Sequence, residues 1–173
     1  TLAAANYDMA QAQIRLGQID AARPYLSAAQ AFWQTNAAKW RSRLIDSRVA
    51  ESQILRAKDP AAAVALLQSA LREHDALHGA DNRLAGVFRN NLGVALQSAG
   101  DLPSAAKAFR EAQAIWANIG LDETPDALNT LNNLAAIETL SGRPAVAEPL
   151  FADAVRLRRK LFGASGATAA SLS

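Results

Sequence analysis

Residues 90–112 of the chain read NNLGVALQSAGDLPSAAKAFREA, and residues 132–154 read NNLAAIETLSGRPAVAEPLFADA. The two stretches align without a gap at an offset of 42 residues. An asparagine pair, a glycine and a later alanine–phenylalanine–alanine series recur at matching places. Self-similarity at a fixed period is the sequence signature of a protein built from stacked structural repeats.

The same frame extends toward the N-terminus. Alanines at 22, 63, 105 and 147 occupy one position of the repeat and lie 41, 42 and 42 residues apart. Prolines at 24 and 149 also fall at equivalent places. We therefore expect a single array of four units, at about 1–41, 42–83, 84–125 and 126–167, with residues 168–173 beginning a further unit.

Each unit reads as two helices joined by a short turn. Alanine is abundant while β-branched and aromatic residues are sparse, a balance that favours helix over sheet. The turns are predicted near residues 17–20, 57–60, 99–103 and 141–144. Gly100 can supply a left-handed helix cap, and Asp59 can cap a helix that starts at Pro60. The prediction is an all-α protein without a β-strand.

This pattern resembles the tetratricopeptide repeat. The small residue at the family's eighth position corresponds to Gly93 and Ala135, and its turn glycine to Gly17, Gly100 and Gly142. The period of 42 residues exceeds the usual 34 and is similar to that of the kinesin-light-chain variety. The resemblance implies a right-handed superhelical solenoid. Unit two departs from the pattern, with Lys58 at the turn glycine and Glu51 at the small position, which leaves the register of its first helix open.

The ends of the chain suggest a fragment of a longer protein. The chain lacks an initiator methionine, and residues 163–173 read like the linker at 79–87 that leads into unit three. On this interpretation Phe151, Val155 and Leu161 would form an exposed apolar end face through which copies could associate.

Composition argues against several classes of function. The 18 basic and 16 acidic residues nearly balance, so we expect no nucleic-acid partner, because such binders carry a dense basic face. No apolar run approaches the length of a membrane span, and direct membrane contact is not expected. No nucleophile motif or phosphate loop occurs, so we expect no catalytic residues and no enzyme in this segment. His74 and His78 share a helix face, but a third ligand is missing; we therefore expect neither a metal site nor a cofactor.

The asparagines are the sharpest candidates for a binding site. In the family that the pattern resembles, first helices line a concave groove, and an asparagine there often holds the backbone of an extended peptide. Asn91 and Asn133 match that position. A structural hydrogen bond to the adjacent hairpin explains them equally well, because asparagine side chains serve both purposes. On the same frame, further residues could face the groove: Tyr7, Gln11, Arg15, Arg48, Asn90, Gln97, Asn129 and Asn132.

The leading hypothesis is a non-catalytic module that binds a protein or peptide partner in its groove. The resemblance extends to arrays in bacterial signalling proteins such as Ser/Thr protein kinases, and the Ala- and Arg-rich composition fits a bacterial source. A structural scaffold or self-association module is the alternative, and a helical-repeat RNA binder is a third. The sequence leaves the compartment open between cytoplasm, which we favour slightly, and a periplasmic sensor domain.

Overall fold

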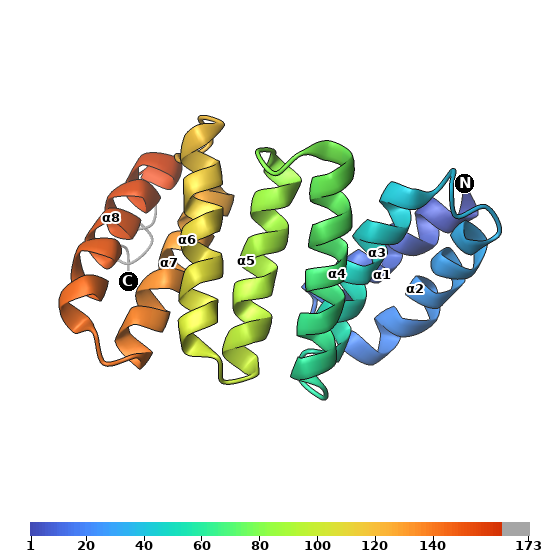
Figure 1. Ribbon diagram of the computed structural model, residues 1–173, viewed down its shortest axis with the longest axis horizontal. Coiled ribbons are helices and arrows are strands. Elements are labelled where there is room, and N and C mark those ends of the chain that lie inside the picture. The colour runs from blue at the N-terminus through green and yellow to red at the C-terminus, as the bar shows by residue number, and fades with distance from the viewer. Residues whose placement is uncertain (164–173) are drawn as a thin grey trace, which may run out of the picture. The chain divides into compact units, whose positions relative to one another are not determined.

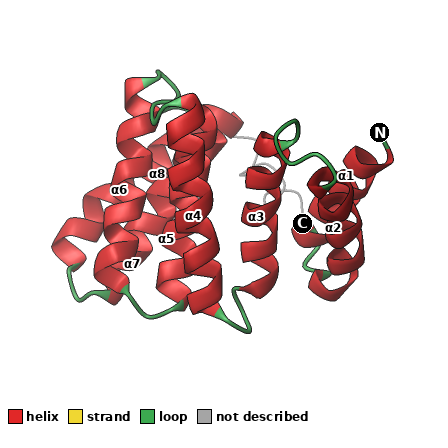
Figure 2. Cartoon of the chain, turned by 45° about the vertical axis from the view of Figure 1, so that its right-hand side comes forward, coloured by secondary structure: helices red, strands yellow, loops and turns green. Residues whose placement is uncertain are grey.

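The computed structural model describes residues 1–163, which form eight α-helices joined by short turns and contain no strand (Figure 2). In chain order the helices are α1 (Leu2–Arg15), α2 (Ile19–Gln34), α3 (Arg41–Leu55), α4 (Pro60–His78), α5 (Arg83–Ser98), α6 (Leu102–Asn118), α7 (Pro125–Leu140) and α8 (Pro144–Phe162). The all-α prediction is confirmed. Within residues 1–163, no helix combines the length and the apolar character that a bilayer crossing requires. The expected start of a further unit, residues 168–173, lies outside the described residues.

The turns within the helix pairs occur where the sequence predicts them. Gly100 and Gly142 follow the ends of α5 and α7 with φ angles of +83° and +70°, a region that glycine enters without steric cost. Where unit two has no glycine, the Asp59 carboxylate accepts a hydrogen bond of 2.9 Å from the backbone N–H of Ala62, and Pro60 opens α4. The expected cap at this turn is therefore present.

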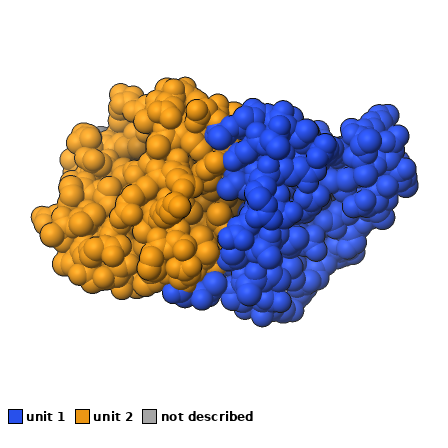
Figure 3. Space-filling model, in the orientation of Figure 1, with its two compact units in different colours: residues 1–80, 98–100 blue, residues 81–97, 101–173 orange. Residues whose placement is uncertain are grey.

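The helices gather into two compact units (Figure 3). Among the described residues, the N-terminal unit comprises residues 1–80 with 98–100, and the C-terminal unit comprises residues 81–97 with 101–163. In the N-terminal unit, two apolar clusters join the helices. Ala10, Ala22 and Ile54 are buried in one cluster, and Trp33 and Leu44 in the other. Small alanines at the contacts allow neighbouring helices to approach closely.

In the C-terminal unit, α7 packs against both α6 and α8 (Figure 1). Two glycines of α5 make room for aromatic rings of α6. A Cβ atom on Gly93 would lie 2.6 Å from the Phe109 ring, and one on Gly86 would lie 2.6 Å from the Trp116 ring. Both rings are buried almost completely. The small residue of the repeat is therefore a packing requirement in α5.

The expected apolar end face is present in part. Phe151 and Val155 on α8 are 43% and 50% exposed. Leu161 differs from the expectation, because it is half-buried and packs against a cluster formed by Leu128, Leu131 and Ala154. It follows that the last turn of α8 contributes to the core of its own unit.

Candidate functional site

Six of the ten predicted groove residues lie together on α5 and α7 of the C-terminal unit. On α7, Asn129, Asn132 and Asn133 have the i, i+3, i+4 spacing that places side chains on one side of a helix. On α5, Asn90, Asn91 and Gln97 occupy the corresponding side. All six are at least partly accessible to solvent. We call these six side chains the amide face.

Two members of the amide face bind each other. The Asn133 side-chain amide donates a hydrogen bond of 3.1 Å to Asn90 Oδ1. The hydroxyl of Thr130 lies 3.2 Å from the same Asn90 oxygen and accepts a hydrogen bond of 3.1 Å from the Trp116 indole N–H. This network joins α5, α6 and α7, so Asn90 and Asn133 have a structural role whatever else they do.

The other four members keep their hydrogen-bonding capacity. Within residues 1–163, the side chains of Asn91, Gln97, Asn129 and Asn132 have no hydrogen-bond partner. Each amide has a donor and an acceptor, which match the two halves of a peptide unit. The amide face can therefore hold an extended backbone without losing any bond of its own.

In the N-terminal unit, the predicted residues Tyr7 and Gln11 are bonded internally. The Tyr7 hydroxyl donates to the backbone oxygen of Asp46 on α3 at 3.3 Å and accepts from the Gln11 side-chain amide at 2.9 Å. Burial, with a further contribution from the Asp46 charge, raises the pKa of Tyr7 to about 12. The pair anchors α1 on α3, whereas Arg15, at the end of α1, is exposed.

Arg48 belongs to a charged cluster. Its guanidinium lies 2.7 Å from one carboxylate oxygen of Glu73, and Arg41 lies 2.7 Å from the other. The hydrogen bond from Arg41, and after it that from Arg48, holds the pKa of Glu73 below its usual range. A pocket of about 300 Å³ between Gln34, Leu44 and this cluster carries two cations against one anion. It is suited to contact with a negatively charged group.

Sequence reasoning missed a buried carboxylate in the C-terminal unit. The side chain of Glu138 on α7 has no solvent exposure and pairs with Arg110 of α6 and with Arg143, whose Nε lies 2.5 Å from Glu138 Oε2. The equivalent position in unit three is the buried Leu96. The signal available in the sequence was a glutamate, Glu138, at a repeat position that is apolar in unit three.

The two histidines lie together at the end of α4. The His74 ring is buried, the exposed His78 ring is 5.0 Å from it, and His78 Nε2 is 3.1 Å from the Ser42 hydroxyl. Among residues 1–163, no group of three or more His, Asp or Glu side chains is arranged to hold a metal ion.

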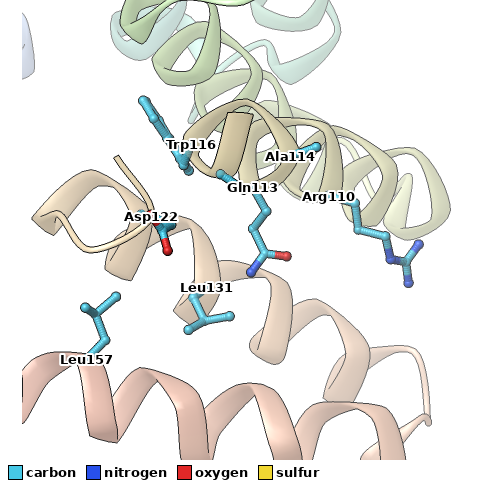
Figure 4. Close-up of a pocket in the computed structure, with 9 residues that line it drawn as sticks. Arg110, Gln113, Ala114, Trp116, Asp122, Leu131 and Leu157 are labelled. Atoms are coloured by element: carbon cyan, nitrogen blue, oxygen red, sulfur yellow. The ribbon is translucent and has the colours of Figure 1, made fainter. Parts of the chain in front are cut away.

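A cleft opens between α6, α7 and α8 in the C-terminal unit (Figure 4). Its volume is about 400 Å³, and it continues into a neighbouring hollow of about 390 Å³. Ala127, Leu131 and Leu157 form apolar parts of its wall, and Gln113 and Asp122 are polar. No sequence prediction included this cleft.

Comparison with known proteins agrees with this arrangement of helix pairs. Residues 88–119 and 127–166 match the family model described as "Tetratricopeptide repeat". The described chain has a tetratricopeptide-repeat fold. Such repeats are in general protein-interaction modules without catalytic residues, and the match covers the units in which α5 to α8 lie. No curated protein sequence matches the chain.

Solved structures share the fold over most of the chain. BtubC (BKLC) from P. vanneervenii has a TM-score of 0.79 at 22% identity over 93% of this chain and 65% of its own. A Podosopora anserina putative kinesin light chain with nearly identical TPR-like repeats has a TM-score of 0.77 at 18% identity, covering 92% of this chain and 77% of its own. Aspartyl phosphate phosphatase F from Bacillus subtilis has a TM-score of 0.78 at 17% identity, covering 92% and 40%. The chain thus spans less than two thirds of BtubC and of the phosphatase.

Proposed function

We propose that this tetratricopeptide-repeat array binds an extended segment of a protein partner along the amide face of α5 and α7. The observation that carries the proposal is the set of four amide side chains, Asn91, Gln97, Asn129 and Asn132, that have no hydrogen-bond partner within residues 1–163. Backbone groups in helices are already satisfied internally, so unpaired side-chain amides are the polar groups available to a ligand.

The Asn90–Asn133 hydrogen bond supports this role, because it fixes the spacing between the two helices. A partner whose backbone meets a preformed row of donors and acceptors loses less conformational freedom in forming the complex. Independently of this face, Arg48 and Arg41 beside Glu73 in the N-terminal unit offer a surplus of positive charge to an acidic group of a partner.

A display selection tests the proposal with random peptides in place of the natural partner. The chain is used to select from a library of such peptides, and the enriched peptides are measured by calorimetry against the wild type and against the Asn91→Ala, Asn132→Ala double variant. We expect the double variant to lose affinity while Glu148→Gln, an exposed change on α8, does not. Enriched peptides that bind the double variant as tightly as the wild type would contradict the proposal.

The parent protein forms a finer part of the proposal. We infer from the resemblance and the composition that the array serves as the docking or sensory part of a larger bacterial signalling protein, such as a Ser/Thr protein kinase. The sequence that flanks this chain tests the inference directly. A kinase domain in the same polypeptide supports it, and a parent protein without any signalling domain contradicts it.

Self-association is a second candidate, favoured by the exposed apolar surface of α8. Phe151 lines an open hollow of about 530 Å³ together with Pro144, Ala147 and Glu148. Val155 is exposed on the next turn of the helix. Analytical ultracentrifugation distinguishes the two roles: a dimer that Phe151→Asp converts to a monomer supports association, whereas a monomer at all concentrations contradicts it.

A further inference from the structure

The cleft between α6, α7 and α8 lies on a different side of α7 from the amide face. At 3.6 residues per turn, Ala127 and Leu131 point away from the side that carries Asn129, Asn132 and Asn133. A ligand in the cleft would therefore leave the amide face accessible. Binding in the cleft does not depend on the proposed function of that face.

The wall of the cleft combines an apolar floor with one unpaired acid. Leu131 and Leu157 face each other from α7 and α8, and Gln113 and Asp122 direct their polar atoms into the space between the helices (Figure 4). Within residues 1–163, neither the Gln113 amide nor the Asp122 carboxylate has a hydrogen-bond or ion-pair partner. An occupant must therefore offer apolar surface and hydrogen-bond donors together.

The charges around the cleft leave Asp122 uncompensated. Arg110 extends toward the end of the cleft that is farther from Asp122 and pairs there with Glu138 (Figure 4). Arg156 lies 3.0 Å from Asp153. Lys160 pairs with Glu123, the neighbour of Asp122 in the same loop. Arg156 and Lys160 on the rim are thus each matched by an acid, and Arg110 shares Glu138 with Arg143 at the far end of the cleft. At the end of the cleft near Asp122, the carboxylate of Asp122 has no paired cation among residues 1–163.

The neighbouring Lys160–Glu123 pair indicates which kind of side chain can bind to the loop that contains Asp122 and Glu123. A lysine of α8 already places its ammonium group on one acid of the loop, while the adjacent acid has no cation within the described residues. Lysine and arginine side chains lay their alkyl stems on apolar surface while the charged head stays at a polar edge. A floor of Leu131 and Leu157 that ends at Asp122 fits such a side chain.

We propose that this cleft is a second partner-binding site, which takes a lysine or arginine side chain of a protein segment. The alkyl stem lies on Leu131 and Leu157, the cationic head pairs with Asp122, and the Gln113 side-chain carbonyl accepts a further hydrogen bond from the head. Apolar contact provides most of the affinity, and Asp122 provides the specificity for a basic over a neutral side chain.

The test uses the acetylated and amidated pentapeptide ALKLA as the probe. Two reference peptides have the same sequence except that norleucine or glutamate replaces the lysine. Each is titrated into the ¹⁵N-labelled chain, and amide and indole signals are followed by NMR. We expect saturable shifts for ALKLA at residues 120–123, at Gln113 and at the Trp116 indole, with affinity about fivefold higher than for the norleucine peptide. The preference for lysine should shrink as salt is raised.

Variants separate the cleft from non-specific contacts. Asp122→Asn should reduce the affinity for ALKLA to that for the norleucine peptide, and Asp8→Asn, a change at an exposed acid on α1 outside the cleft, should leave both affinities unchanged. Equal binding of the lysine and glutamate peptides would overturn the proposal. So would shifts that fall outside the cleft, the absence of saturable shifts, or an Asp122→Asn variant that retains the preference for lysine.

Discussion

The Asn133 side chain donates a hydrogen bond of 3.1 Å to Asn90 Oδ1 and thereby connects equivalent turns of two successive first helices, α7 and α5. The two residues are 43 positions apart, one more than the repeat period. One asparagine of each pair thus bonds to the neighbouring repeat, while Asn91 and Asn132 have side chains without a partner among residues 1–163. The recurring asparagine pair accordingly combines a structural residue with one available to a partner.

The first prediction concerns this bond. Asn133→Ala should lower the free energy of unfolding by about 0.5–1.5 kcal/mol, the net contribution of a neutral hydrogen bond. Asn132→Ala should change it by less than about 0.5 kcal/mol, since that side chain has no partner among the described residues. Chemical denaturation of both variants provides the comparison. Equal losses in the two variants would show that the bond does not stabilise the fold.

The second prediction concerns the close approach of α5 and α6. Gly93→Ala should destabilise the protein by about 1–3 kcal/mol although alanine favours helix, because its Cβ would lie 2.6 Å from the Phe109 ring. Phe109→Leu shortens the ring side chain, so the double variant should lose less stability than the sum of the two single changes. Thermal melts of the four proteins measure this coupling. A Gly93→Ala protein more stable than the wild type would contradict the packing argument.

The third prediction concerns the buried carboxylate. Glu138→Gln removes the charge that pairs with Arg110 and Arg143 while keeping the shape of the side chain. We expect the free energy of unfolding to fall by about 1–3 kcal/mol. This is less than for a fully buried ion pair, because both guanidinium groups are about half exposed and can turn toward water. Glu148→Gln on α8 is the control. Unchanged stability of Glu138→Gln in urea would show that the ion pairs contribute nothing.

The fourth prediction concerns alkaline pH. The pKa of Tyr7 is raised from 10.0 to about 12 in the folded protein, first by burial. The folded state therefore holds this proton more tightly than the unfolded chain, and the resulting stability is present below pH 10 and is lost as the pH rises toward about 12. In a Tyr25→Phe background, absorbance at high pH should show a single late tyrosine ionisation. Ionisation of Tyr7 near pH 10 in the folded protein would contradict the assignment.

The repeat frame could predict the helices and turns because these depend on local sequence. Glycine at 100 and 142, the Asp59–Pro60 cap and the spacing of apolar residues each determine structure within a few positions. The repeat frame could also place the six side chains of the amide face on corresponding sides of α5 and α7. It could not predict that Asn133 bonds to Asn90, because that contact depends on the axial register between two helices.

The other features missing from the sequence analysis also depend on contacts between helices. Glu138 finds one partner on α6, 28 residues away, and a second in the turn before α8. The cleft of Figure 4 lies between three helices, and the short side chains of Ala114 and Ala117 on α6 form part of its lining. The spacing of the alanines in the sequence does not show whether side chains fill the space between two helices or leave a cleft there. The internal bonds of Tyr7 and Gln11, which the frame assigns to the groove, again depend on the position of α3.

Mapping a bound peptide would show whether the amide face binds the backbone of a protein segment. A peptide enriched by selection is added to the ¹⁵N-labelled chain, and cross-saturation from the peptide is measured at the side-chain amides of Asn91, Gln97, Asn129 and Asn132. We predict saturation of these four signals. We also predict that the Asn91→Ala, Asn132→Ala double variant binds the peptide with roughly tenfold to hundredfold lower affinity. Saturation confined to other surfaces, with affinity unchanged in the double variant, would contradict the claim.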